Sequence, residues 1–196
     1  MRIRMAARLC LLQAILFCCA FLATIADSTG ASHWAIDPAR THIDFEIDAV
    51  AFPRTHGEFK KFSGGISVDF DHPERSRVEF HVDTASAEVG SLSFSSYVRS
   101  EALLNAPHFP TIEFVSTSVR KIDERTVRVT GNLTMLGVIR PLDVEVDVQG
   151  GADGSHKRLE FVAKARIDRL EFGMTSGYPV ISRDVDLVIS SEAYES

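Results

Sequence analysis

Apolar and polar residues alternate with a period of two along most of this chain. Residues 41–50, "THIDFEIDAV", place Ile43, Phe45 and Ile47 on one parity, and His42 with three acidic residues on the other. Successive side chains of a β-strand point to opposite faces, so such a run predicts a strand with one dry face and one wet face. The pattern recurs about eight times, which indicates an all-β fold.

Short polar turns separate the predicted strands. The later alternating runs are FSGGISVDF, RVEFHVDT, TIEFVSTSV, TVRVTGNLTML, PLDVEVDV, LEFVAKARI and VDLVISSEA. Turns such as DHPERS at 71–76, KIDERT at 121–126 and GGADGSHK at 150–157 lie between them. Short strands joined by short turns predict an antiparallel sheet, either a sandwich or a closed barrel. The pattern favours a barrel, since closure leaves no strand edge unpaired, but a sandwich satisfies it as well.

One segment departs from the alternation. Within residues 93–110, Tyr97, Glu101 and Leu104 follow a near-helical spacing. Serines suited to capping precede them, and Asn105 and Pro107 stand where a helix would end. We therefore predict one short helix near residues 95–105.

The first 26 residues are typical of a cleaved signal peptide. Three arginines begin the segment, an apolar run from Leu9 to Ile25 follows, and "TIA" precedes Asp27. An uncleaved anchor is the alternative, but polar residues follow where a basic stop would be expected. We expect residues 27–196 to form a single exported domain without disulfides, because all three cysteines lie in the signal. We expect no stable membrane insertion of that domain after cleavage.

The charge of the chain argues against nucleic acid as a partner. The formal net charge is −6 for the whole sequence, and the predicted signal removes arginines but no acids. Binding to nucleic acid depends mainly on neutralising phosphate charge, so an acidic domain is a poor candidate for it.

The sequence contains no convincing catalytic, metal or cofactor site. The seven histidines are too widely spaced to share a helical turn, and the predicted mature chain has no cysteine. A G-x-S-x-G elbow and a phosphate-binding glycine loop are also missing. His42 and His81 share parity with acidic residues, which favours solvated side chains. Most phenylalanines beyond residue 26 fall on the dry parity or beside the predicted helix, where they either fill the barrel or line a cavity.

Several segments resemble a known family. The blocks WAIDPARTHIDFEI, YVRSEALLNAPHFPTIEFVSTSV and VTGNLTMLGVIRPLDVEV are similar, in order and spacing, to the YceI-like polyisoprenoid-binding family, and the resemblance runs from about Trp34 to Glu192. It implies a lipocalin-like, extended antiparallel eight-stranded β-barrel exported to the periplasm. Its tunnel would hold an isoprenoid lipid, either a polyprenyl phosphate or an isoprenoid quinone, with no further cofactor. Family members are often dimeric, so a homodimer is a further expectation.

The dry parity and this resemblance together predict the ligand-binding residues. We expect the tunnel to be lined by Phe45, Ile47, Phe62, Ile66, Val68, Phe80, Val82, Leu103, Leu104, Phe114, Leu133, Val144 and Phe161. Arg99 and Arg140, which match family positions, are candidates for contact with a polar head group. The chain departs from the family where Phe94-Ser95 replaces a common Arg-Asp pair ahead of the helix, which weakens the expectation of a pyrophosphate head.

Two other function classes remain open at this point. An isomerase or cyclase acting on an apolar substrate in the same cavity would need an inward polar group, and Thr134 and Tyr178 are the modest candidates. A stress-response scaffold with no ligand would need none. The leading hypothesis is a non-enzymatic lipid carrier.

Overall fold

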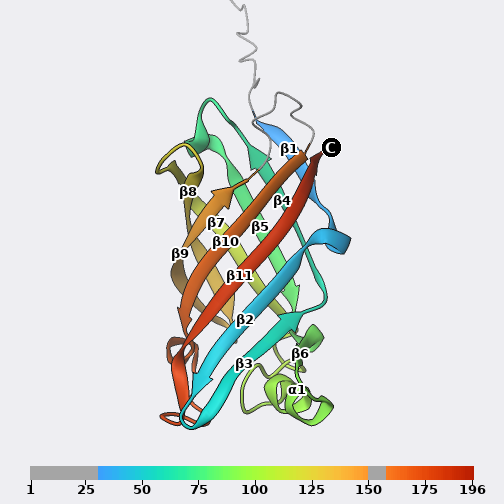
Figure 1. Ribbon diagram of the computed structural model, residues 1–196, viewed down its shortest axis with the longest axis vertical. Coiled ribbons are helices and arrows are strands. Elements are labelled where there is room, and N and C mark those ends of the chain that lie inside the picture. Colours follow the sequence, from blue (N-terminus) through green and yellow to red (C-terminus); the bar gives the residue numbers. More distant parts are fainter. Residues whose placement is uncertain (1–30, 150–157) are drawn as a thin grey trace, which may run out of the picture.

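The computed structural model describes residues 31–149 and 158–196, which form a closed antiparallel β-barrel (Figure 1). The predicted signal peptide, residues 1–26, and the predicted turn at 150–157 lie outside the described residues. The strands are β1 Ser32–Ile36, β2 His42–Ala49, β3 Phe52–Phe59, β4 Phe62–Val68, β5 Arg77–Asp83, β6 Ala87–Val89, β7 Thr111–Lys121, β8 Thr126–Met135, β9 Val138–Val148, β10 Arg158–Asp168 and β11 Ile181–Glu195.

Eight positions around the barrel accommodate these strands. Five are filled by β7, β8, β9, β10 and β11, each pairing with its neighbour along the chain. Each of the other three is filled by two consecutive strands, β1 with β2, β3 with β4, and β5 with β6. The ring closes because β11 pairs with β10 on one side and with both β1 and β2 on the other. The predicted eight-stranded barrel is confirmed, and the sandwich alternative is excluded.

Aspartates mark two of the breaks between consecutive strands. The 3₁₀ turn η1 Pro38–Arg40 separates β1 from β2, and the side chain of Asp37 accepts a hydrogen bond from Ala39 N at 2.9 Å. The turn η3 Thr84–Ser86 separates β5 from β6 in the same way, with Asp83 accepting from Ala85 N at 2.8 Å. A short acidic side chain satisfies a backbone N–H that the interrupted ladder leaves free, so the strand can bend there.

A bulge in β7 explains a change of parity in its sequence. Ile112 and Phe114 occupy one parity of this strand, while Val119 occupies the other. The pairing of β7 with β8 shifts its register between Ser116 and Ser118. An extra residue at a bulge moves the following side chains to the other face. Val119 is therefore buried inside the barrel, whereas Val115 faces outwards.

The one α-helix, α1, spans Leu92–Arg99 rather than residues 95–105. The prediction of a single short helix was right, but its boundaries were wrong. The true N-cap is Ser91, whose side chain accepts a hydrogen bond from Phe94 N at 3.3 Å. Backbone turns replace the helix from Ser100 onwards, because that residue is extended and Asn105 has a φ of 45°. Helix α1 packs beside β6 at the end of the barrel drawn lowest in Figure 1.

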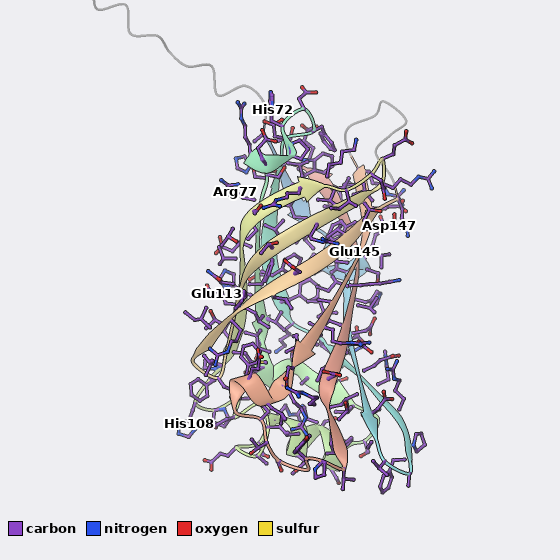
Figure 2. All side chains as sticks on the ribbon, turned by 90° about the vertical axis from the view of Figure 1, so that its left-hand side faces the viewer. His72, Arg77, His108, Glu113, Glu145 and Asp147 are labelled. Atoms are coloured by element: carbon purple, nitrogen blue, oxygen red, sulfur yellow. The ribbon has the colours of Figure 1, made fainter. Side chains whose placement is uncertain are left out.

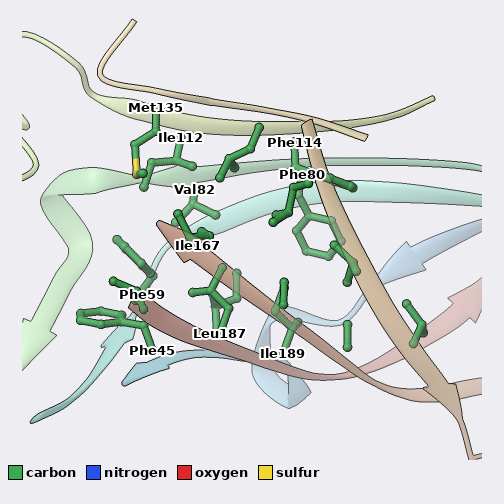
Figure 3. Close-up of a pocket in the computed structure, with 18 of the residues that line it drawn as sticks. Phe45, Phe59, Phe80, Val82, Ile112, Phe114, Met135, Ile167, Leu187 and Ile189 are labelled. Carbon is green, nitrogen blue, oxygen red and sulfur yellow. The ribbon is translucent and has the colours of Figure 1, made fainter. Parts of the chain in front are cut away.

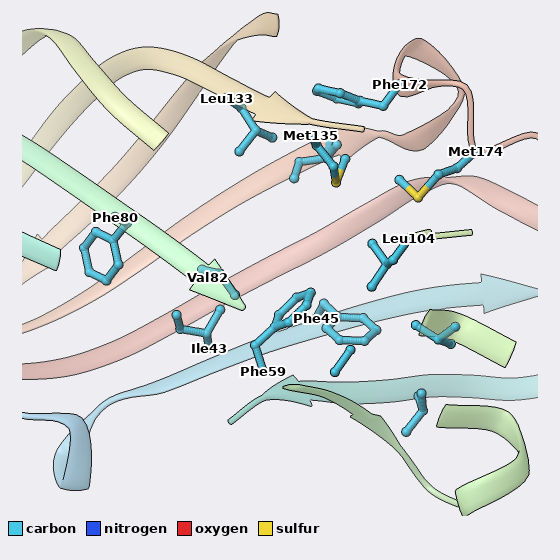
Figure 4. Packing of buried hydrophobic residues seen from close by; sticks show 14 residues of the cluster. Ile43, Phe45, Phe59, Phe80, Val82, Leu104, Leu133, Met135, Phe172 and Met174 are labelled. Carbon is cyan, nitrogen blue, oxygen red and sulfur yellow. The ribbon is translucent and has the colours of Figure 1, made fainter. Parts of the chain in front are cut away.

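The two faces of the wall differ as the alternation predicts. Acidic side chains such as Glu113, Glu145 and Asp147 project from the outer face (Figure 2). Among the described residues the inward side chains form two apolar clusters, the larger of which is drawn in Figure 4. Gly57 gives the Phe45 ring its space, since a Cβ at that glycine would lie 2.2 Å from the ring. No helix in the described part of the chain is both long and apolar enough to span a bilayer.

Candidate functional site

The barrel encloses a cavity of about 1440 Å³ rather than a solid core. This volume exceeds the roughly 300–1,000 Å³ of pockets that hold drug-sized ligands. Its walls consist mainly of phenylalanine, valine, isoleucine and leucine side chains contributed by strands around the whole barrel (Figure 3). The dry parity of the strands therefore lines an interior space, and that space has room for a long apolar molecule.

Twelve of the predicted tunnel residues border the cavity. They are Phe45, Ile47, Ile66, Val68, Phe80, Val82, Leu103, Leu104, Phe114, Leu133, Val144 and Phe161. The remaining one, Phe62, stands opposite Val82 and packs against the larger apolar cluster without bordering the cavity. Whether these side chains contact a ligand stays a prediction, but the fold gathers them on one continuous inner surface.

The two arginines proposed for a head group lie away from the cavity. Arg99 is partly buried and donates from Nη1 to the carbonyl of Ala87 at 3.1 Å, which ties α1 to β6. Arg140 shares the parity of Leu142 and Val144 in β9 but is exposed near the hairpin, where it donates to the carbonyl of Ile139 at 3.0 Å and stands 4.0 Å from Glu171. Neither side chain borders the enclosed space. The geometry therefore gives no support to the head-group role expected of them.

Arg169 is the cationic side chain that sequence reasoning missed. It borders the cavity and is only 2% exposed. Its Nε donates to the carbonyl of Ser182 at 2.7 Å, and Nη2 donates to that of Ile181 at 3.0 Å. Nη1 donates to the carbonyls of Ser176, at 3.0 Å, and of Met174. Within the described ranges no carboxylate forms an ion pair with it, and burial lowers the pKa of the guanidinium from its ordinary value.

The alternation in β10 was the signal that would have found Arg169. The inward side chains of β10 are Leu159, Phe161, Ala163, Ala165 and Ile167. The next position of the same parity is Arg169. Asp168 caps the 3₁₀ turn η4 Arg169–Phe172 by accepting from Leu170 N at 3.0 Å. A cation on the dry parity at the end of a strand is unusual, because an unpaired charge avoids burial. Here backbone carbonyls of the following loop and of the first residues of β11 accept the hydrogen bonds that a carboxylate would otherwise accept.

The polar groups expected of an enzyme are only partly present at the cavity. Tyr178 borders it and is more than half exposed, at the end that also carries Arg169. Thr134 follows the outward parity between Leu133 and Met135 and does not border the cavity, so its expected inward position was wrong. General acid–base catalysis needs a titratable group beside the reacting atoms. Phenylalanine and aliphatic side chains occupy the middle of the wall.

The histidines expected on the wet face lie there. His42 Nδ1 is 3.1 Å from Glu58 Oε1, outside the barrel. His81 lies between Glu79, at 2.8 Å, and Glu113, at 3.4 Å. The ligand atoms of these last three residues are within 4.8 Å of one another, and they form the one cluster of described residues with the spacing of a metal site. It lies on the outer face, separate from the cavity, where carboxylate–imidazole pairing accounts for it.

A closed antiparallel barrel around an apolar cavity defines a lipocalin-like barrel. Residues 34–193 match the family model described as the YceI-like domain. The Salmonella newport (strain SL254) protein called Protein YceI is 31% identical over 181 residues, which cover 89% of this chain and 94% of that protein. The chain belongs to the YceI-like family.

Solved structures share the fold. The crystal structure of Burkholderia cenocepacia BcnA matches with a TM-score of 0.73 and 24% identity, over 80% of this chain and 98% of that one. A polyisoprenoid binding domain from Saccharophagus degradans, implicated in plant cell wall breakdown, matches with a TM-score of 0.66 and 15% identity. That match covers 83% of this chain and 98% of the domain. At these identities the two structures support the architecture alone.

Proposed function

We propose that this protein is a non-enzymatic carrier that holds an isoprenoid-type lipid inside the barrel and acts in the periplasm after signal cleavage. The observation that carries the proposal is the apolar cavity of about 1440 Å³. Burying each CH₂ group of a hydrocarbon gains about 0.8 kcal/mol, so a long chain binds well without any specific polar contact. The domain from Saccharophagus degradans that shares this fold is described as polyisoprenoid binding, which is the ligand class proposed here.

A polar head group would be oriented by Arg169. This guanidinium is the buried cation on the cavity wall, and no described carboxylate pairs with it. Its positive charge would attract the phosphate of a polyprenyl phosphate or the carbonyl oxygen of an isoprenoid quinone. Tyr178 adds a phenol hydroxyl at the same end. The head would therefore lie at the end formed by α1 and the loop after η4, with the chain running along the phenylalanine wall.

Binding is proposed rather than catalysis because of what lines the middle of the cavity. Phe80, Phe114 and Phe161 border it there, where a reaction on the chain would need an acid or a base. An apolar wall of this kind holds a hydrocarbon in place and excludes water from it.

Lipid extraction with mass spectrometry tests the proposal on protein purified from a bacterial host. We expect one amphiphile with an isoprenoid chain to copurify at close to one molecule per barrel. Folded protein that consistently carries no amphiphile, and whose melting temperature does not respond to added isoprenoids, would refute the carrier function.

A charge placed on the cavity wall gives a sharper version of this test. Phe80→Arg puts a cation on the inner face of β5, where it can be hydrated by water in the empty cavity but opposes an apolar chain. We expect the variant to fold and to lose most of its lipid. Val115→Arg is the matched control, because Val115 lies on the outer face of the neighbouring strand β7 and is exposed. Equal lipid in both variants would contradict the proposed binding site.

A further inference from the structure

One end of the barrel carries a group of exposed apolar side chains. We call them the apolar rim, and they are Val50, Phe52, Leu92, Phe94, Tyr178 and Val180. Leu92 is 87% exposed, Phe52 69% and Val50 68%. Scattered apolar residues are normal on protein surfaces, but an apolar group gathered in one place marks an interaction surface.

Three segments bring the rim together at the end drawn lowest in Figure 1. They are the turn between β2 and β3, the first turn of α1, and the loop between η4 and β11. The backbone N–H of Val50 donates to the carbonyl of Val180 at 2.8 Å, which joins the first segment to the third. The hydroxyls of Tyr97 and Ser176 lie 2.7 Å apart and join the helix to the same loop.

The rim continues directly into the cavity. Phe52, Phe94, Tyr178 and Val180 are exposed to solvent and also border the enclosed space. An apolar surface therefore extends from the phenylalanine wall to the outside of the molecule. A ligand that leaves at this end meets mainly apolar side chains. Arg54, His56 and Arg169 also border the cavity here, but Arg54 is paired with acids and Arg169 is bonded to backbone carbonyls.

At its opposite end the cavity is bordered by charged side chains. There the turn between β7 and β8 contributes Lys121, Glu124 and Arg125 to its border. Exposed apolar side chains near this end include Phe70, Ile122 and Tyr194. An apolar ligand would meet charged groups at this opening, so the rim marks the end suited to exchange.

The charges beside the rim are paired with one another. Arg54, two residues after Phe52, lies 2.7 Å from Glu46, 2.9 Å from Asp48 and 3.0 Å from Asp186. Arg183, beyond Val180, pairs with Asp168. These ion pairs leave little positive charge to attract anionic head groups. Contact at this end would depend on the insertion of apolar side chains and would respond weakly to salt.

We infer that the apolar rim docks on the surface of a lipid bilayer and that the ligand passes there between bilayer and cavity. The inference rests on the proposed function, because a water-insoluble lipid is exchanged with the membrane that dissolves it. The rim also has the shape for this contact, since Val50 and Leu92 project from a tight turn and a helix start. Side chains at such tips enter the interfacial layer without spanning the membrane.

Flotation with neutral phosphatidylcholine vesicles tests the docking. The rim variant is Val50→Ser combined with Leu92→Ser, because these two exposed rim side chains do not border the cavity. The control is Ile122→Ser combined with Val115→Ser, which also removes two exposed apolar side chains, one in the turn between β7 and β8 and one on the outer face of β7. We expect the wild type and the control to float with the vesicles at low and high salt. The rim variant should bind at least about tenfold more weakly, since it loses two inserted side chains.

Lipid retention separates this inference from the proposed function. Both variants should keep the lipid supplied to them in detergent, since neither changes a side chain that borders the cavity. Transfer of a fluorescent isoprenoid from vesicles should be slowed only in the rim variant.

Equal vesicle binding by both variants, or binding that needs anionic lipid and disappears with salt, would overturn the docking while leaving the carrier function intact. Capture of a protein partner by the rim without any vesicle binding would also overturn it. Loss of lipid from wild type and variants alike would instead refute the carrier function.

Discussion

Replacing Arg169 with methionine should destabilise the protein by about 3 kcal/mol. The guanidinium donates hydrogen bonds to the carbonyls of Met174, Ser176, Ile181 and Ser182. Each bond from a charged donor is worth about 1.5–3 kcal/mol, so the gross loss is roughly 6–12 kcal/mol. Two effects offset it. Methionine removes a buried charge whose desolvation was unfavourable, and the loop after η4 lies at a barrel end where its carbonyls regain water.

Urea unfolding followed by circular dichroism measures this difference. For a domain of this size, about 3 kcal/mol corresponds to a fall in melting temperature of roughly 6–12 °C. Arg140→Met is the control, because Arg140 is half exposed and donates only to the carbonyl of Ile139 among the described residues. It should change the free energy of unfolding by less than about 0.5 kcal/mol. A loss below about 1 kcal/mol for Arg169→Met, or equal losses for both variants, would refute the view that Arg169 holds this loop.

Two further predictions concern the cavity and the outer ion pairs. Ala163→Phe adds a ring at a buried position that borders the cavity. We expect severalfold less extracted lipid per barrel, with no fall in the urea midpoint of unfolding. Unchanged lipid would contradict this prediction. The hydrogen bond from Arg183 holds the pKa of Asp168 below its usual range. That contribution to stability is present above the unfolded pKa of about 3.9 and is lost as pH falls through the lower folded value. Because the Arg183 side chain is more than half exposed, the effect is small. Arg183→Gln should raise the midpoint of acid unfolding slightly, which a pH titration of circular dichroism will show.

The alternation of the strands predicted most of the barrel. It assigned the inner faces of β2, β8, β9 and β10, because a period of two depends only on local backbone geometry. It also placed nearly all of the predicted lining residues on the inner surface, with Phe62 as the exception. Neither the pairing of β11 with both β1 and β2 nor the size of the cavity follows from a local pattern, since each depends on contacts between distant segments.

The features that were missed have local causes. The helix was expected at Ser95 because its serine cluster looked like a cap, whereas Ser95 is buried and Ser91 caps the helix. Arg169 was not predicted, because a cation on the dry parity is expected to avoid burial and the four backbone carbonyls that bind it are not visible in a sequence. Arg99 and Arg140 were chosen by family position, and their carbonyl partners show structural contacts instead.

The strand pairing that closes the barrel determines when the cavity can form during synthesis and folding. Trp34 in β1 stands opposite Glu195 in β11, and Phe45 in β2 stands opposite Leu187. The wall is therefore incomplete until the final strand has been synthesised, and its closure joins segments that are far apart in sequence, which is slow. No nascent chain that lacks β11 has the cavity. Any lipid that the barrel carries must be acquired by the finished protein, after folding and at the place where folding ends.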